Sequence, residues 1–173
     1  DSKKLARMDI KNEDEANKAL DKIRKSSFKI TKIVSKRVKR NPLAPFTTST
    51  LQQEASNKLG FGASRTMRIA QKLYEGVNIG SETTGLITYM RTDGVQLSSQ
   101  AIEELREEII NRHGKDYIPQ IPRVYKSKAA NAQEAHEAIR PTSISRDPED
   151  MSQYLDTEQL KLYELIWKRT ISS

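Results

Sequence analysis

The stretch GLITYMRTDG, residues 85–94, places a tyrosine and an arginine two positions apart in a short β-prone run that an Asp-Gly turn closes. Side chains alternate between the two faces of an extended segment, so Ile87, Tyr89 and Arg91 are expected on the same face. A tyrosine that attacks a phosphate needs a nearby cation, which favours the phenolate and neutralises the phosphate. The pair is therefore a candidate nucleophile with its cationic partner, although a strand tyrosine more often serves only in packing.

The exact sequence around Tyr89 and two other segments favour the catalytic interpretation. Residues 87–93, ITYMRTD, resemble the active-site signature of type IA DNA topoisomerases. Residues 44–55, APFTTSTLQQEA, and residues 133–141, QEAHEAIRP, resemble two further motifs of this family and occur in the family's order. The resemblance extends from about residue 28 to the C-terminus.

The resemblance implies an enzyme that cleaves and reseals one DNA strand and thereby relaxes negative supercoils. Tyr89 would remain on the 5′ phosphate as a phosphotyrosine ester, and reversal would reseal the strand without ATP. The sequence has no GxxxxGK[ST] motif for ATP, in agreement with this chemistry. The sequence departs from the family at Gly94, where many members carry serine, and in a longer loop over residues 76–85.

The family also uses Mg²⁺, which a separate domain with an acidic cluster binds near the scissile phosphate. No such cluster occurs in this sequence, so we expect no metal site in this chain and no strand cleavage by it alone. The expected partners are single-stranded or negatively supercoiled DNA and the remaining domains of the parent enzyme.

Two residues are candidates for stabilising the phosphate during attack. Arg91 offers a planar fork of donors to a pentacovalent phosphate. Glu134 and Glu137 would favour the charged form of His136, which can then hold a phosphate oxygen. A lone histidine is more often structural, but the family motif favours a catalytic role. Arg140 can pair with Glu137 or with phosphate, and the sequence leaves both open.

Composition limits the other possibilities. A chain of 173 residues with 35% hydrophobic content can bury one ordinary core. With no cysteine and two histidines, it lacks the ligands for thiolate or histidine-based metal sites. No apolar run approaches the roughly 20 residues of a membrane span, and no signal sequence opens the chain, so we expect a cytoplasmic protein. The resemblance implies association with the bacterial nucleoid. The start at Asp1 suggests an excised piece.

The positive charge is concentrated near the N-terminus. Residues 1–45 carry 14 Lys and Arg against 6 Asp and Glu, whereas residues 46–173 carry 16 against 17. Such a cluster suits contact with a nucleic acid backbone, and it also suits a solvated linker or a protected strand edge. The candidate DNA contacts in this region are Lys36, Arg37, Lys39 and Arg40.

The predicted fold is mainly α with a small β component. Asn12 is a good N-cap for a helix that ends near Ser26, and residues 28–34 are typical of a strand. Pro42 and Pro45 mark a boundary near residue 41. We therefore predict a strip of a β-rich arch (linker) domain over residues 1–40 and a helical catalytic tyrosine domain over residues 41–173.

Capping residues predict the helices of the second domain. Ser49 and Gln52 form a possible capping box for a helix that Gly60 ends, and a second helix over 64–75 would complete a helix-turn-helix-like pair. Further helices are expected over 98–112 and 157–171, the latter with Trp167 in the core or an interface. Three basic residues line one face of the second helix, as DNA contacts or simply as a solvated face: Arg65, Arg68 and Lys72.

Two non-catalytic interpretations compete with the topoisomerase hypothesis. The helix pair and the basic N-terminus would also suit a nucleic-acid-binding helical module without a covalent step. A protein-interaction helical domain is the third possibility. A phosphotyrosine adduct at Tyr89 would distinguish the first hypothesis from the other two.

Overall fold

The computed structural model describes residues 4, 6, 8–125 and 137–173. The chain divides into two compact units, Asp1–Arg40 and Asn41–Ser173. The first unit contains helix α1 (Glu13–Arg24), and the side chain of Asn12 caps it by accepting a hydrogen bond from the Glu15 N–H (2.9 Å). This helix confirms the prediction from the cap. None of its residues is buried.

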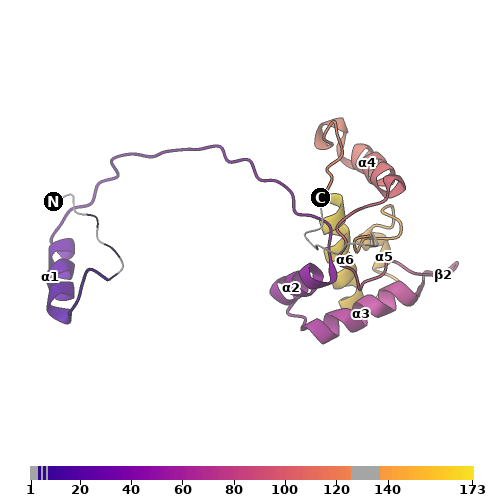
Figure 1. Ribbon diagram of the computed structural model, residues 1–173, viewed down its shortest axis with the longest axis horizontal. Coiled ribbons are helices and arrows are strands. Elements are labelled where there is room, and N and C mark those ends of the chain that lie inside the picture. Colours follow the sequence, from indigo (N-terminus) through magenta and orange to yellow (C-terminus); the bar gives the residue numbers. More distant parts are fainter. Residues whose placement is uncertain (1–3, 5, 7, 126–136) are drawn as a thin grey trace. The chain divides into compact units, whose positions relative to one another are not determined.

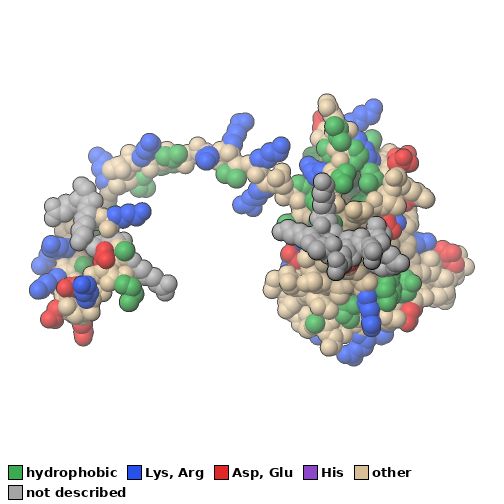
Figure 2. Space-filling model, in the orientation of Figure 1, with side chains coloured by type: hydrophobic (Ala, Val, Ile, Leu, Met, Phe, Trp, Pro, Cys, Tyr) green, Lys and Arg blue, Asp and Glu red, His purple; other side chains and the backbone are tan. Residues whose placement is uncertain are grey.

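The strand predicted over residues 28–34 does not form. A β-strand needs a neighbour for its backbone hydrogen bonds, and the described part of the first unit contains no other strand. Ile33 is consequently 85% exposed. Lys and Arg side chains project along the segment that follows α1 (Figure 2). The assignment of this unit to an arch domain stays a prediction.

Three helices build the second unit by packing against one another: α2 (Thr48–Leu59), α3 (Ala63–Glu75) and α6 (Thr157–Ile171) (Figure 1). The capping box of α2 joins Thr47 and Thr50, two residues before the predicted Ser49 and Gln52. Gly60 ends α2 in the left-handed conformation (φ 69°), as predicted. The first two helices form the expected helix-turn-helix-like pair.

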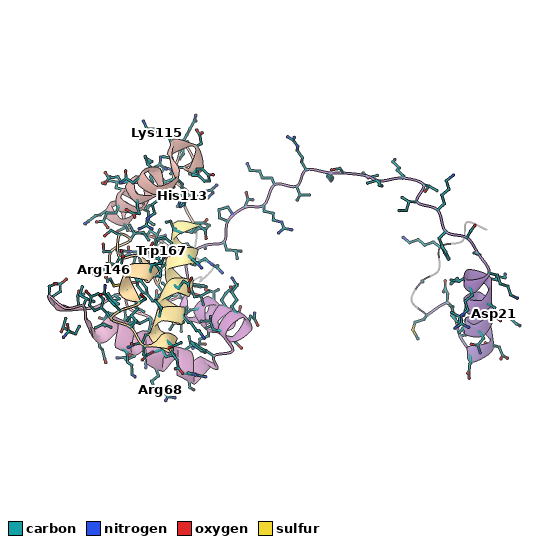
Figure 3. All side chains as sticks on the ribbon, turned by 180° about the vertical axis from the view of Figure 1, so that it is seen from behind. Asp21, Arg68, His113, Lys115, Arg146 and Trp167 are labelled. Atoms are coloured by element: carbon teal, nitrogen blue, oxygen red, sulfur yellow. The ribbon has the colours of Figure 1, made fainter. Side chains whose placement is uncertain are left out.

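The core of the second unit lies where these helices meet the loops around Tyr89. Trp167 on α6 is 8% exposed, and its indole N–H donates to the Ile144 carbonyl (2.9 Å), so its predicted place in the core is confirmed (Figure 3). The largest fully buried hydrophobic side chains are Phe46, Leu51, Leu73, Leu86, Ile87, Met90, Ile139, Leu162, Tyr163 and Ile166.

The segment between α3 and Tyr89 contains a small hairpin that we expected to be a loop. Strands β1 (Val77–Asn78) and β2 (Thr83–Thr84) pair antiparallel, with Val77 opposite Thr84. The strand predicted through Tyr89 does not form, because the backbone there bonds to loops and to α2 instead of to a neighbouring strand. Only an isolated bridge, Ile87 to Pro141, marks its start.

The remaining elements are α4 (Ser99–His113), a 3-10 turn η1 (Lys115–Tyr117) and the short helix α5 (Pro148–Met151), which packs on α6. The Ser98 side chain caps α4 by accepting from the Ala101 N–H (3.2 Å), in agreement with the predicted helix. Among the helices of the described residues, none has the length and apolar character to span a bilayer.

Candidate active site

The segment that carries Tyr89 is fixed on its N-terminal side by the downstream motif. The Thr88 N–H donates to the Arg140 carbonyl (2.9 Å), and the Thr88 hydroxyl donates to the Ala138 carbonyl (2.7 Å). The Arg140 N–H in turn donates to the Thr88 hydroxyl (3.0 Å). These three bonds hold the residue before Tyr89 against residues 138–140.

On its C-terminal side, the same segment is fixed by the first residue of α2. The Thr48 hydroxyl donates to the Met90 carbonyl (2.7 Å) and accepts from the Thr92 N–H (2.8 Å). The Thr48 N–H donates to the Thr92 carbonyl (2.9 Å). Thr48 is therefore hydrogen-bonded to the backbone on both sides of Arg91, a role that its place in the sequence did not indicate.

The two anchoring motifs also bond to each other. The Ile139 N–H donates to the Phe46 carbonyl (2.8 Å). The Ala138 N–H donates to the carbonyl of Gln96 (2.9 Å), which lies outside both motifs and follows the segment that carries Tyr89. Parts of all three motifs that resemble one family, including residues 137–141 of the third, thus come together around Tyr89 although they are far apart in sequence.

Tyr89 and Arg91 are exposed, whereas the residues between and after them point inward. The Tyr89 side chain is 48% exposed, Met90 is fully buried and Thr92 is 7% exposed. Arg91 is exposed. Ile87, expected on the face of Tyr89, is buried, because residues 86 and 87 both pack into the core below the hairpin.

Arg91 borders a shallow depression at the N-terminus of α2, with a volume of about 340 Å³. Thr47, Thr48 and Ser49 line it from the helix, and Asp93 lines it from the turn. The partial positive charge of a helix N-terminus favours an anion there, and the guanidinium adds a full charge. Thr92 shapes the turn, since its hydroxyl accepts from the Gly94 N–H (2.9 Å).

The ring of Tyr89 rests against a second tyrosine. Tyr74, on α3, lies with its ring centroid 5.3 Å from that of Tyr89, and the two planes meet at 63°. This edge-to-face contact spans the hairpin, so sequence spacing gave no indication of it.

Arg140 pairs with Glu137, one of the two partners that the sequence left open. Its Nε donates to Glu137 Oε1 (2.7 Å), its Nη2 donates to Oε2 (3.1 Å), and its Nη1 donates to the Pro141 carbonyl (2.8 Å). Burial by itself would raise the pKa of Glu137, but the hydrogen bonds from Arg140 and the Ser98 N–H outweigh it and lower the pKa below its usual value. The contact of Arg140 with phosphate stays a prediction. The candidate His136 lies outside the described residues.

The three basic residues on one face of α3 differ in their surroundings. Arg65 forms an ion pair with Glu158 of α6 and stacks over the Phe61 ring, 4.7 Å from its centroid. Arg68 and Lys72 are exposed, and together with Arg65 and Glu158 they line a second depression, separate from the one that Arg91 borders. Figure 3 places Arg68 at the outer side of the unit. Neighbouring cations, chiefly Arg65, lower the pKa of Glu158.

The remaining basic candidates belong to the first unit, where each is exposed: Lys36, Arg37, Lys39 and Arg40. Their contact with DNA stays a prediction. Within the described ranges, no group of three or more His, Cys, Asp or Glu side chains is arranged to hold a metal ion.

Comparison with known proteins decides the family. The family model described as DNA topoisomerase matches residues 1–173, the whole chain. The chain belongs to the type IA DNA topoisomerase family. Its relatives include DNA topoisomerase 1 from Rickettsia bellii, 57% identical over 98% of this chain and 21% of that protein. DNA topoisomerase 1 from Helicobacter pylori is 49% identical over 98% of the chain and 23% of that protein.

A solved structure of the same family agrees in fold. Full-length topoisomerase I from Thermotoga maritima is 48% identical, with a TM-score of 0.65 over 76% of this chain and 20% of that chain. The present chain thus spans about a fifth of the length of these topoisomerases.

Proposed function

We propose that this chain carries the nucleophile of a type IA DNA topoisomerase, an ATP-independent isomerase that cleaves and reseals one DNA strand to relax negative supercoils. The observation that carries the proposal is the arrangement of the Tyr89 segment (residues 86–92). Its backbone is bonded to two other family motifs, while Tyr89 and Arg91 are both exposed and Arg91 borders the depression at the N-terminus of α2.

The chemical step is a transesterification. The Tyr89 Oη attacks the phosphorus, the new O–P bond forms, and the bond between phosphorus and the 3′ oxygen breaks. The phenolic proton is lost and the leaving oxygen gains one, so the products are a 5′-phosphotyrosine ester and a 3′ hydroxyl. Reversal restores the phosphodiester and needs no ATP, because the ester conserves the energy of the bond.

Arg91 stabilises the charge that develops on the phosphate oxygens, and it does so from the depression at the N-terminus of α2. We assign His136 the second phosphate contact, on the basis of its place in the third motif. Arg68 and Lys72 extend the contact along the DNA backbone, together with the basic segment of the first unit.

Mg²⁺ belongs to the proposed reaction, although the described residues offer no ligand set for it. We assign the ion to a part of the enzyme outside this chain, where it would supply positive charge near the scissile phosphate. The chain alone is then expected to bind single-stranded DNA weakly and to leave supercoiled plasmid unrelaxed.

The test uses the full-length enzyme, meaning the longer polypeptide that carries this segment. It is mixed with a single-stranded oligonucleotide and Mg²⁺, denatured with detergent, and examined for a covalent protein–DNA adduct. Tyr89→Phe removes only one hydroxyl and is expected to abolish the adduct. Tyr117→Phe is the matched control, since Tyr117 is 71% exposed on the η1 turn.

An adduct that persists in Tyr89→Phe would refute the assignment of the nucleophile. DNA binding without an adduct in the unmodified enzyme would instead favour a non-catalytic nucleic-acid-binding module.

A further inference from the structure

Tyr74 is the aromatic residue that contacts the proposed nucleophile. Its ring lies edge-to-face with that of Tyr89, at 5.3 Å between centroids and 63° between planes. Aromatic pairs prefer this geometry, because the positive edge of one ring meets the negative face of the other. The Tyr74 ring therefore restricts the orientations open to the phenol.

The backbone of Tyr74 is fixed relative to the Tyr89 segment. The Leu86 N–H donates to the Leu73 carbonyl (2.7 Å), which joins the end of α3 to the start of the segment. Gly85 passes so close to Tyr74 that a Cβ there would lie 2.5 Å from the Tyr74 carbonyl oxygen. The two tyrosines are thus carried by parts of the backbone that are in direct contact.

Burial of apolar surface does not explain the pair. Tyr74 is 41% exposed and Tyr89 is 48% exposed, so neither ring belongs to the core. A half-exposed phenol that must attack a phosphorus atom in line can lose much of its rate if it samples other rotamers, since small misplacements of reacting groups cost up to about 100-fold.

We propose that Tyr74 is a positioning residue, whose ring holds the Tyr89 phenol in the orientation from which it attacks DNA. The role belongs to the aromatic ring of Tyr74 and not to its hydroxyl. The proposal rests on the proposed function, because it takes Tyr89 as the nucleophile.

The experiment compares Tyr74→Leu and Tyr74→Phe in the full-length enzyme. The measurements are the single-turnover rate of adduct formation on a single-stranded oligonucleotide and the Kd for that oligonucleotide without cleavage. Tyr74→Leu is expected to slow adduct formation about tenfold, equivalent to about 1.4 kcal/mol, with Kd changed less than about twofold. Tyr74→Phe is expected to restore the rate to within about twofold of the unmodified enzyme.

Tyr117→Leu is the matched control. Tyr117 also pairs with a neighbouring ring, that of His113 at 5.6 Å, and its removal is expected to leave the rate unchanged. Unfolding midpoints of all variants are measured in parallel, so that a rate is compared only between folded proteins.

Three results would overturn the proposal: an unchanged rate in Tyr74→Leu, an equal loss in Tyr74→Phe, or a weakening of Kd that accounts for the whole loss of rate. Absence of an adduct at Tyr89 in the unmodified enzyme would refute the proposed function itself. The two failures are therefore distinguishable.

Discussion

Replacement of Thr48 by valine removes the hydroxyl that is hydrogen-bonded to the Tyr89 segment, while the side chain keeps nearly the same shape. The Thr48 hydroxyl donates to the Met90 carbonyl (2.7 Å) and accepts from the Thr92 N–H (2.8 Å), so the substitution breaks two short hydrogen bonds. It also breaks a longer one to the Thr92 carbonyl (3.1 Å), which keeps its bond from the Thr48 N–H. It also leaves a carbonyl and an amide without their partner in a half-buried position.

The expected loss of stability follows from these two bonds. A hydrogen bond contributes about 0.5–1.5 kcal/mol net, and a buried group left without a partner costs about 1–3 kcal/mol. The site is partly exposed, so water can hydrogen-bond to the freed carbonyl and amide in part. We therefore expect destabilisation of roughly 2 kcal/mol. Valine and threonine have similar helix propensities, so the change in propensity contributes little to the loss of stability.

The assay is urea unfolding of the purified chain, with the free energy taken from the midpoint at constant slope. Thr157→Val is a matched control, because Thr157 is also the first residue of a helix, α6, and its side chain is exposed. It should change stability by less than about 0.5 kcal/mol. Thr48→Ser keeps the hydroxyl and should recover most of the loss.

In the full-length enzyme, Thr48→Val should also slow adduct formation, while Thr48→Ser should not. Equal stability of Thr48→Val and Thr157→Val would show that the Thr48 bonds do not anchor the segment, and the reasoning would fail.

Three further predictions concern the same region. Gly85→Ala places a Cβ 2.5 Å from a backbone oxygen of α3, so it should destabilise the chain by about 1–3 kcal/mol in urea, whereas Gly62→Ala, with no atom within 4 Å of the added Cβ, should cost less than about 1 kcal/mol, the difference between glycine and alanine as the N-cap of α3. Arg91→Lys should reduce the rate of adduct formation about tenfold or more with a much smaller change in Kd, because lysine keeps the charge but loses the planar fork; equal losses would indicate binding only. Glu137→Gln should cost about 1–3 kcal/mol above pH 4.5, because it weakens the pairing with Arg140. The lowered pKa means that this contribution is complete above the unfolded-state pKa and is lost as pH falls through the folded-state pKa, so unfolding curves from pH 3 to 7 should converge at low pH; a constant difference would contradict the pairing.

Helix ends were predictable from the sequence because they depend on local residues. Asn12 caps its helix as predicted, the helix predicted over 98–112 forms as Ser99–His113, and Gly60 ends α2 with a positive φ. The start of α2 was predicted two residues late, because Thr47 and Ser49 are equally good caps by type. The choice is made by a distant contact, the bond between the Thr48 N–H and the Thr92 carbonyl (2.9 Å).

Strand predictions failed because a strand depends on a neighbour that the local sequence does not specify. Ile33 lies in a β-prone run but has no strand beside it, and the backbone around Tyr89 bonds to a helix end and to loops. The hairpin of β1 and β2 was missed for another reason, since each of its strands is only two residues long.

The contacts of the candidate site were beyond sequence reasoning even where the motifs were recognised. The resemblance indicated which segments act together, but not that Thr48 would reach Met90, 42 residues away. The resemblance also did not indicate the contact between the rings of Tyr74 and Tyr89, which lie on either side of the hairpin in sequence. The exposure of Tyr89 and Arg91 together was expected from alternation, whereas the burial of Ile87 was not.

The central claim is that Tyr89 becomes covalently attached to DNA, and peptide mapping tests it most directly. The adduct formed by the full-length enzyme is trimmed with nuclease, digested with trypsin, and analysed by tandem mass spectrometry. Cleavage after Lys72 and Arg91 yields a peptide of residues 73–91 that contains both Tyr74 and Tyr89, so fragment ions must separate the two. We predict a nucleotide linked through its 5′ phosphate to Tyr89; a nucleotide on Tyr74 or on any other peptide would contradict the account.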